Sequence, residues 1–88
     1  MKVLVLYRPN SEYGRIVEEF IHDFQRRYER EHIEVLNIDS RDGSATASLY
    51  DVMQHPAILV LANDGVIQRC WMGSSLPRLD DVVSYARV

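Results

Sequence analysis

The 88-residue sequence predicts an α/β fold: a four-stranded mixed sheet with helices on both faces. Three observations predict it. Short apolar runs alternate with amphipathic segments, which is typical of helices packed on a sheet. The first two runs flank one long helical pattern, as in a right-handed βαβ unit. The last two runs flank Asn63-Asp64-Gly65, a hairpin turn signal. The predicted order is therefore βαβ, then α, then ββα.

Residues 2–7 are aliphatic on both faces, as expected of a central strand that is buried on both sides. Residues 12 to about 30 form an amphipathic helix, because apolar residues recur at three- and four-residue steps. These are Tyr13, Ile16, Val17, Phe20, Ile21, Phe24 and Tyr28. We expect Ser11 to be the N-cap of this helix and Glu12 to be favourable in its first turn.

Residues 33–39 form a second strand, parallel to the first because a helix joins them. The polar run 40–44 is a turn. A shorter helix over residues 45–54 follows, with Leu49, Val52 and Met53 expected to face inward. It stops before Pro56, because the residue that precedes a proline is disfavoured in the α region.

Residues 57–62 form a fully apolar strand, and residues 66–72 form its hairpin partner. Gly73-Ser74-Ser75 leads to Leu76-Pro77 and a last helix that runs through residue 88. Four residues of this helix are expected to face inward: Leu79, Val82, Val83 and Ala86.

The composition fits one soluble domain over residues 1–88, with 47% apolar and 26% charged residues. A net charge of −3 argues against nucleic acid as a partner. The lone Cys70 excludes an internal disulfide and suits a reducing compartment. The N-terminal apolar run is too short for a membrane span and lacks a cleavage site for secretion, so we expect a cytoplasmic protein without membrane contact.

Four landmarks carry a family resemblance. Residues 8–14, read as Arg-Pro-Asn-Ser-Glu-Tyr-Gly, resemble the glutaredoxin motif K/R-P-N-C-x-Y-C at the start of a helix. His55-Pro56 resembles the cis-proline before a strand, Asp64-Gly65 the hairpin that follows, and Gly73 the glycine before the closing helix. The whole chain thus resembles the thioredoxin-like superfamily, with glutaredoxin and thioredoxin as the nearest members.

Both cysteines of that motif are replaced, by Ser11 and Gly14. A serine hydroxyl near a helix N-terminus does not ionise at neutral pH, whereas a cysteine thiol there does. Thiol-disulfide exchange and iron–sulfur cluster binding are therefore not implied, and no catalytic residue is assigned. We expect Cys70 to be a partly buried apolar residue. The scattered histidines suggest no metal site.

The resemblance implies a binding site rather than a reactive one, recognising a peptide, a protein partner or a small carboxylate. Arg8 matches a lysine that contacts the glutathione carboxylate, Tyr13 matches the motif's tyrosine, and residue 55 would offer its backbone to an extended peptide. The free N–H groups of Glu12, Tyr13 and Gly14 at the helix start favour an anion. The site residues are Arg8, Asn10, Ser11, Glu12, Tyr13, Gly14, His55 and Pro56.

No cofactor is required, and bound glutathione is an open alternative. The segment Gly73-Ser74-Ser75-Leu76 lacks the acidic residue that holds the γ-glutamyl end in glutaredoxins, although its two serines offer hydroxyls. Two further alternatives stay open. One is a glutathione-dependent or hydrolytic enzyme in which Ser11 acts, with His55 as its base. The other is a structural subunit of a complex, whose loop is covered by a partner.

Overall fold

A computed structural model describes residues 2–73 and 75–86 of the chain. It contains four strands and three helices in the predicted order within this described part. They are β1 (Lys2–Tyr7), α1 (Gly14–Arg27), β2 (Ile33–Asn37), α2 (Arg41–Leu49), β3 (Ala57–Leu61), β4 (Ile67–Met72) and α3 (Leu79–Ala86).

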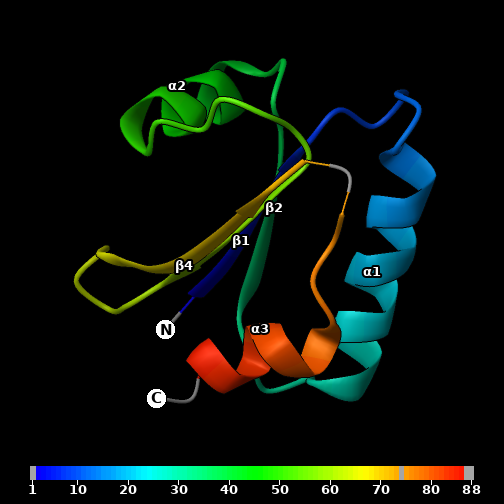
Figure 1. The fold of residues 1–88 in the computed structure, drawn as a ribbon, viewed down its shortest axis with the longest axis vertical. Helices are drawn as coiled ribbons and strands as arrows, with labels where there is room; N and C mark the ends of the chain where they lie inside the picture. Colours follow the sequence, from blue (N-terminus) through cyan, green and yellow to red (C-terminus); the bar gives the residue numbers. More distant parts are fainter. Residues whose placement is uncertain (1, 74, 87–88) are drawn as a thin grey trace.

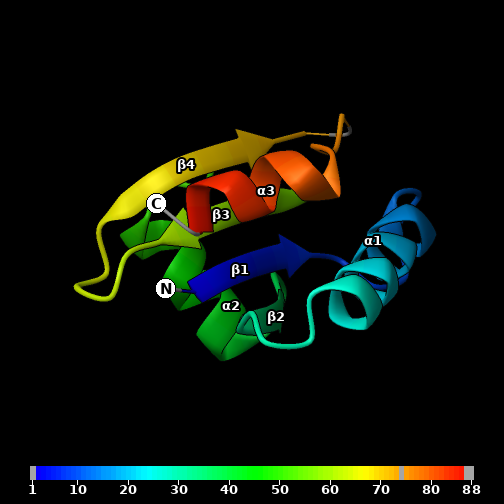
Figure 2. The same cartoon turned by 90° about the horizontal axis from the view of Figure 1, so that it is seen from below.

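The four strands form one mixed sheet in the order β2-β1-β3-β4. β1 runs parallel to β2 and antiparallel to β3, and β4 pairs with β3 as a hairpin. Gly65 occupies the turn with a φ of +87°, a conformation that glycine adopts without strain. Figures 1 and 2 show α1 and α3 on one face of the sheet and α2 on the other.

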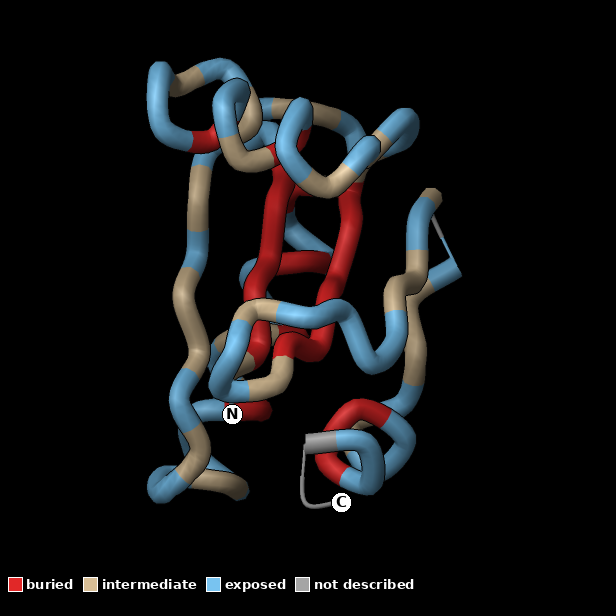
Figure 3. The backbone as a smooth tube through the Cα atoms, turned by 90° about the vertical axis from the view of Figure 1, so that its left-hand side faces the viewer, coloured by how far each residue is buried: buried red, intermediate tan, exposed pale blue. Residues whose placement is uncertain are grey.

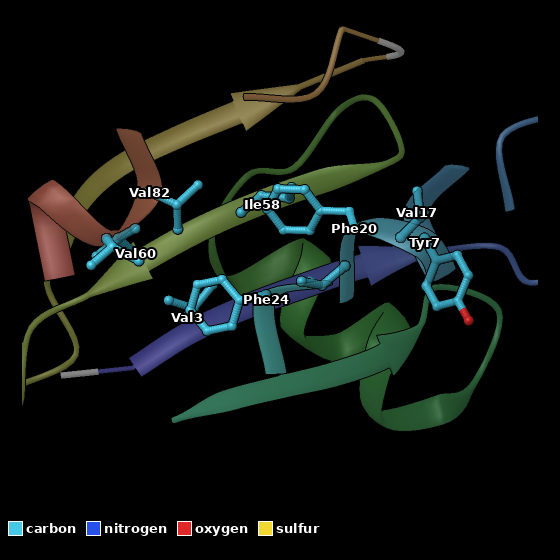
Figure 4. Close-up of a cluster of buried hydrophobic side chains, with 10 residues drawn as sticks. Val3, Tyr7, Val17, Phe20, Phe24, Ile58, Val60 and Val82 are labelled. Atoms are coloured by element: carbon cyan, nitrogen blue, oxygen red, sulfur yellow. The ribbon is translucent and has the colours of Figure 1, made fainter. Parts of the chain in front are cut away.

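The two central strands are buried on both faces, so their side chains divide between two apolar clusters (Figure 3). Alternate residues of a strand point to opposite faces, and the aliphatic run of β1 supplies both clusters. The larger cluster lies between the sheet and helices α1 and α3 (Figure 4). Its buried members are Val3, Val5, Tyr7, Val17, Phe20, Phe24, Ile58, Val60, Val82 and Val83. The cluster under α2 contains Leu4, Leu6, Ala47, Ala57, Leu59 and Leu61.

Helix α1 begins two residues later and ends earlier than the sequence predicted, and its predicted cap is wrong. Tyr13, not Ser11, occupies the N-cap position, and its side chain makes no capping hydrogen bond. The Ser11 hydroxyl instead donates to the Arg8 carbonyl oxygen at 2.6 Å. Glu12 therefore lies outside the helix, whose first turn has no acidic residue. Residues 11–13 belong to the loop because Ser11 folds back on it.

Helix α2 begins four residues earlier and ends five residues earlier than predicted. Ser40 is its N-cap: the Ser40 hydroxyl oxygen accepts a hydrogen bond from the Gly43 N–H at 2.9 Å. The predicted inward positions of Leu49 and Met53 are wrong, because these side chains are 73% and 85% exposed. Val52 does pack against the cluster under α2.

Helix α3 closes the larger cluster as predicted. Val82 and Val83 are buried, and Leu79 packs against them from the edge of the cluster. The Ala86 side chain, also predicted to face inward, lies outside what the structure describes. On the neighbouring edge strand, Trp71 packs edge-on against Tyr85 with ring centroids 5.7 Å apart.

Candidate functional site

Three loops meet at the end of the sheet where β1 ends and β3 begins (Figure 1). They are residues 8–13 after β1, residues 55–56 before β3, and Gly73 after β4. The Gly73 N–H donates to the Pro56 carbonyl oxygen at 2.9 Å, which joins the last two loops. We call residues 8–13, 55–56 and 73 the three-loop cluster; it contains all the sequence-predicted site residues except Gly14, which follows the first loop directly.

Asp39 pairs with the first loop from the segment after β2. The Arg8 guanidinium donates from Nε to Asp39 Oδ2 at 2.7 Å and from Nη2 to Oδ1 at 3.0 Å. This bidentate hydrogen bonding from Arg8 is the main cause that lowers the pKa of the Asp39 carboxyl, and the charge of His55 acts in the same direction. Arg8 therefore already has an anionic partner within the chain.

Ser11 is held by the loop itself. Its N–H and its hydroxyl both donate to the Arg8 carbonyl oxygen, and its own carbonyl oxygen accepts the Gly14 N–H at 3.1 Å. The expectation that Gly14 offers a free N–H to an anion is therefore wrong. The Ser11 hydroxyl proton points to a backbone carbonyl, so the arrangement does not match a serine activated by His55.

Gly14 is buried where the loop crosses the start of α1. A Cβ atom added to Gly14 would lie 2.1 Å from the Pro9 carbonyl oxygen and 3.2 Å from that of Arg8. Distances this short require the backbone of the loop to move. The loop conformation therefore depends on a residue without a side chain at position 14.

The peptide bond between His55 and Pro56 is cis, as the family resemblance implied. Pro56 is buried and His55 is half-buried. Within residues 2–73 and 75–86, the backbone N–H and C=O of His55 form no hydrogen bond. Asn10 and Glu12 are exposed at the same end, and their side chains have no hydrogen-bond partner among the described residues. The cluster thus presents unpaired polar groups around a buried proline.

No group of histidine, cysteine and acidic residues that could hold a metal ion occurs in the described part of the chain. None of its helices is long and apolar enough to span a membrane.

Comparison with solved structures gives close matches at low sequence identity. Thioredoxin 1 from Thermosipho africanus superposes with a TM-score of 0.71 at 11% identity, over 99% of this chain and 91% of that chain. Thioredoxin O2 from Arabidopsis thaliana in its oxidised state gives 0.72 at 15% identity, over 98% and 71%. A malarial protein gives 0.74 at 15% identity, over 98% and 92%. The chain has a thioredoxin-like fold. No protein-family model and no curated protein sequence matches it.

The lone cysteine of this thioredoxin-like chain lies away from the three-loop cluster. Cys70 is on β4, paired in register with Leu59, and packs against the cluster under α2. Burial raises the pKa of its thiol, so the neutral form is favoured. The prediction that Cys70 is a partly buried apolar residue is confirmed.

Sequence reasoning missed Asp39, whose carboxylate accepts both hydrogen bonds from Arg8 at this end of the thioredoxin-like sheet. A signal was present, because parallel neighbours end at the same edge of a sheet. Tyr7 is in register with Asn37, so the residues that follow each strand, Arg8 and Asp39, meet there. Ser74, one of the two serines whose hydroxyls the sequence offers to glutathione, lies outside the described residues.

Proposed function

We propose that this chain is a redox-inactive, thioredoxin-like binding module in which Ser11 and Gly14 stand where the active-site cysteines of the superfamily would be. Its three-loop cluster would bind an extended segment of a peptide or protein partner without breaking a bond. The single observation that supports this most is the backbone of the half-buried His55, whose N–H and C=O form no hydrogen bond among the described residues.

An extended peptide can use such groups because strand pairing needs only a matching N–H and C=O on the ligand. The buried Pro56 and the Gly73 N–H fix the neighbouring backbone, so residue 55 is presented on a rigid support. A small carboxylate such as that of glutathione is less favoured, because Arg8 is already paired with Asp39. The lone Cys70 fits a reducing compartment, and we propose a cytoplasmic location.

The redox part of the proposal is tested by insulin reduction with dithiothreitol as the electron donor. We expect the rate with the protein to equal the rate without it, because the cluster contains no thiol. A Cys70→Ser variant should behave in the same way. Turnover above background that Cys70→Ser abolishes would assign the chemistry to Cys70 and overturn the proposal.

The binding part is tested with a library of blocked, extended heptapeptides, followed by amide NMR on the uniformly ¹⁵N-labelled chain. A selected peptide should shift the amides of Ser11, Tyr13 and His55. N-methylation of one peptide amide, the one that pairs with the His55 carbonyl, should weaken binding about tenfold, since one hydrogen bond is lost. Tyr13→Ala should weaken it as well, whereas the exposed Gln25→Ala on α1 should not. Peptides whose affinity is indifferent to N-methylation at every position would contradict strand pairing.

A further inference from the structure

The β2 edge of the sheet carries backbone groups that the rest of the described chain does not use. Among the strands of the described residues, β2 has β1 as its only neighbour. The His32 carbonyl and the Ile38 N–H, just outside its two ends, both pair with β1. In a parallel ladder every second residue pairs with the same neighbour, so the N–H and C=O groups of Ile33 and Val35 point away from the sheet.

The two edges of the sheet differ in how they are protected against pairing with another strand. β4 carries a register shift opposite Val60 and Leu61, and exposes the side chain of Arg69. Bulges and edge charges of this kind block strand addition. β2 has no bulge and no proline, and its charged Glu34 is neutralised by Lys2 at 2.7 Å. The β2 edge is therefore the one open to another strand.

A cavity of about 380 Å³ lies beside this edge on the α2 face. Leu4 and Leu36 from the sheet and Leu49 from α2 give it an apolar lining. Its charged lining residues are Asp42 and the ion pair of Lys2 with Glu34, so Asp42 supplies the unpaired charge. The Asp42 side chain forms no ion pair or hydrogen bond within the described residues. Volumes of 300–1,000 Å³ with a few placed polar groups are typical of ligand sites.

We propose that the β2 edge and this cavity form a second binding site, for an extended peptide segment with basic side chains at alternate positions. The segment adds to the sheet beside Ile33 and Val35, as in other cases of strand addition. Every second side chain then lies on the α2 face next to Glu34 and Leu36, where the free carboxylate of Asp42 attracts a cation. This site lies away from the three-loop cluster and does not depend on its function.

Charge and size favour a basic peptide over a second copy of the chain. Each copy has a net charge of −3, so two copies repel one another while a basic segment is attracted. A contact along one five-residue strand also buries far less than the roughly 1,200–2,000 Å² of a stable protein interface. A short segment needs no more than such a contact.

The probe is the blocked hexapeptide Ac-Val-Lys-Val-Arg-Val-Lys-NH₂, with Ac-Val-Glu-Val-Glu-Val-Glu-NH₂ as the charge-reversed control. We expect the basic peptide to give saturable shifts at the amides of Ile33, Val35 and Asp42, and the acidic one to bind at least tenfold more weakly. Asp42→Asn should weaken binding of the basic peptide severalfold. No saturable shift up to about 2 mM, or equal binding of both peptides, overturns the proposal.

Proline at position 35 tests the backbone directly. It removes the outward N–H of Val35 while the bonds to β1 stay, because proline is tolerated on an edge strand whose N–H faces solvent. Val35→Pro should no longer bind the basic peptide, whereas Val35→Thr, which keeps the N–H, should still bind it. Circular dichroism shows whether Val35→Pro is folded, and the N-methylated probe replaces that variant if it is not. Shifts confined to the three-loop cluster, or a dimer in light scattering that the probe does not dissociate, contradict the proposal.

Discussion

Gly14 is the residue on which the shape of the first loop depends most directly. Its added Cβ would lie 2.1 Å from the Pro9 carbonyl oxygen. Overpacking typically costs about 1–3 kcal/mol, more than the roughly 1 kcal/mol that alanine gains over glycine in a helix. We expect Gly14→Ala to lower the free energy of unfolding by about 1–2 kcal/mol, measured by urea denaturation. The exposed Gln25→Ala on the same helix should change it by no more than about 0.5 kcal/mol. If Gly14→Ala and the parent were equally stable, the loop would accommodate the added Cβ at no cost in free energy.

The same close contact bears on restoring a cysteine pair. A cysteine at position 14 carries the same Cβ, so Ser11→Cys with Gly14→Cys forces the carbonyl groups of Arg8 and Pro9 to move. Disulfide exchange by this double variant therefore requires the loop to rearrange first.

The Arg8–Asp39 pair makes a pH-dependent contribution whose sign follows from the pKa shift. The pKa of Asp39 is lowered from its ordinary 3.8, chiefly by the hydrogen bonds from Arg8. The stabilisation is therefore present above the unfolded-state pKa and is lost as pH falls through the lowered folded-state pKa. We expect Asp39→Asn to lower the Tm slightly at pH 7 and to match the parent near pH 2, in thermal scans from about pH 7 to pH 2. Glu12→Gln, at an exposed position in the loop, should track the parent throughout. A constant difference at all pH values would contradict the ion pair.

At the scale of the elements, Ser40 and Ser11 show what decides where a helix begins. The Ser40 hydroxyl accepts from the Gly43 N–H and donates to the Asn37 carbonyl oxygen, whereas the Ser11 hydroxyl caps no helix. We expect Ser40→Ala to cost about 1 kcal/mol of stability and Ser11→Ala about half as much. The exposed Ser48→Ala within α2 controls for the change of residue type. If Ser11→Ala costs more than Ser40→Ala, the assignment of the caps is wrong.

Strands were predictable from sequence where helix ends were not. After Lys2, the run of residues 3–7 is apolar and buried at every position, which only a central strand accommodates in a chain of this size. Helix α2 begins at Arg41 because Ser40 caps it. Its Gly43 also lies against the end of β2, where an added Cβ would be 1.9 Å from the Asn37 carbonyl oxygen. No local pattern shows that contact, and the sequence therefore predicts a turn for the polar run 40–44.

At the scale of the whole molecule, the sequence indicated which loops meet but not how they are held. The order of the strands and the landmarks at residues 8–14 and 55–56 were enough to place those loops at one end of the sheet. The pairing of Arg8 with Asp39 depends on two loops from separate strands, and its bidentate geometry follows from their positions in space. The position of β2 at an edge likewise follows from strand order, which becomes visible only once the sheet is assembled.

The sharing of β1 and β3 by both apolar clusters predicts that residues 1–88 unfold as one domain. Leu59 is buried under α2, while its neighbour Ile58 is buried under α1 and α3. Leu59→Ala should lower the free energy of unfolding by about 3 kcal/mol, because it leaves a cavity in β3, a strand that contributes side chains to both clusters. Trp71 lies against the opposite cluster, so its fluorescence reports on the face without the cavity. In urea titrations of Leu59→Ala, the unfolding midpoint should move to a lower urea concentration than in the parent. The shift should be the same by Trp71 fluorescence and by far-UV circular dichroism. If the fluorescence midpoint stays at the parent value while the circular dichroism midpoint falls, the two faces unfold separately and the chain is not one cooperative unit.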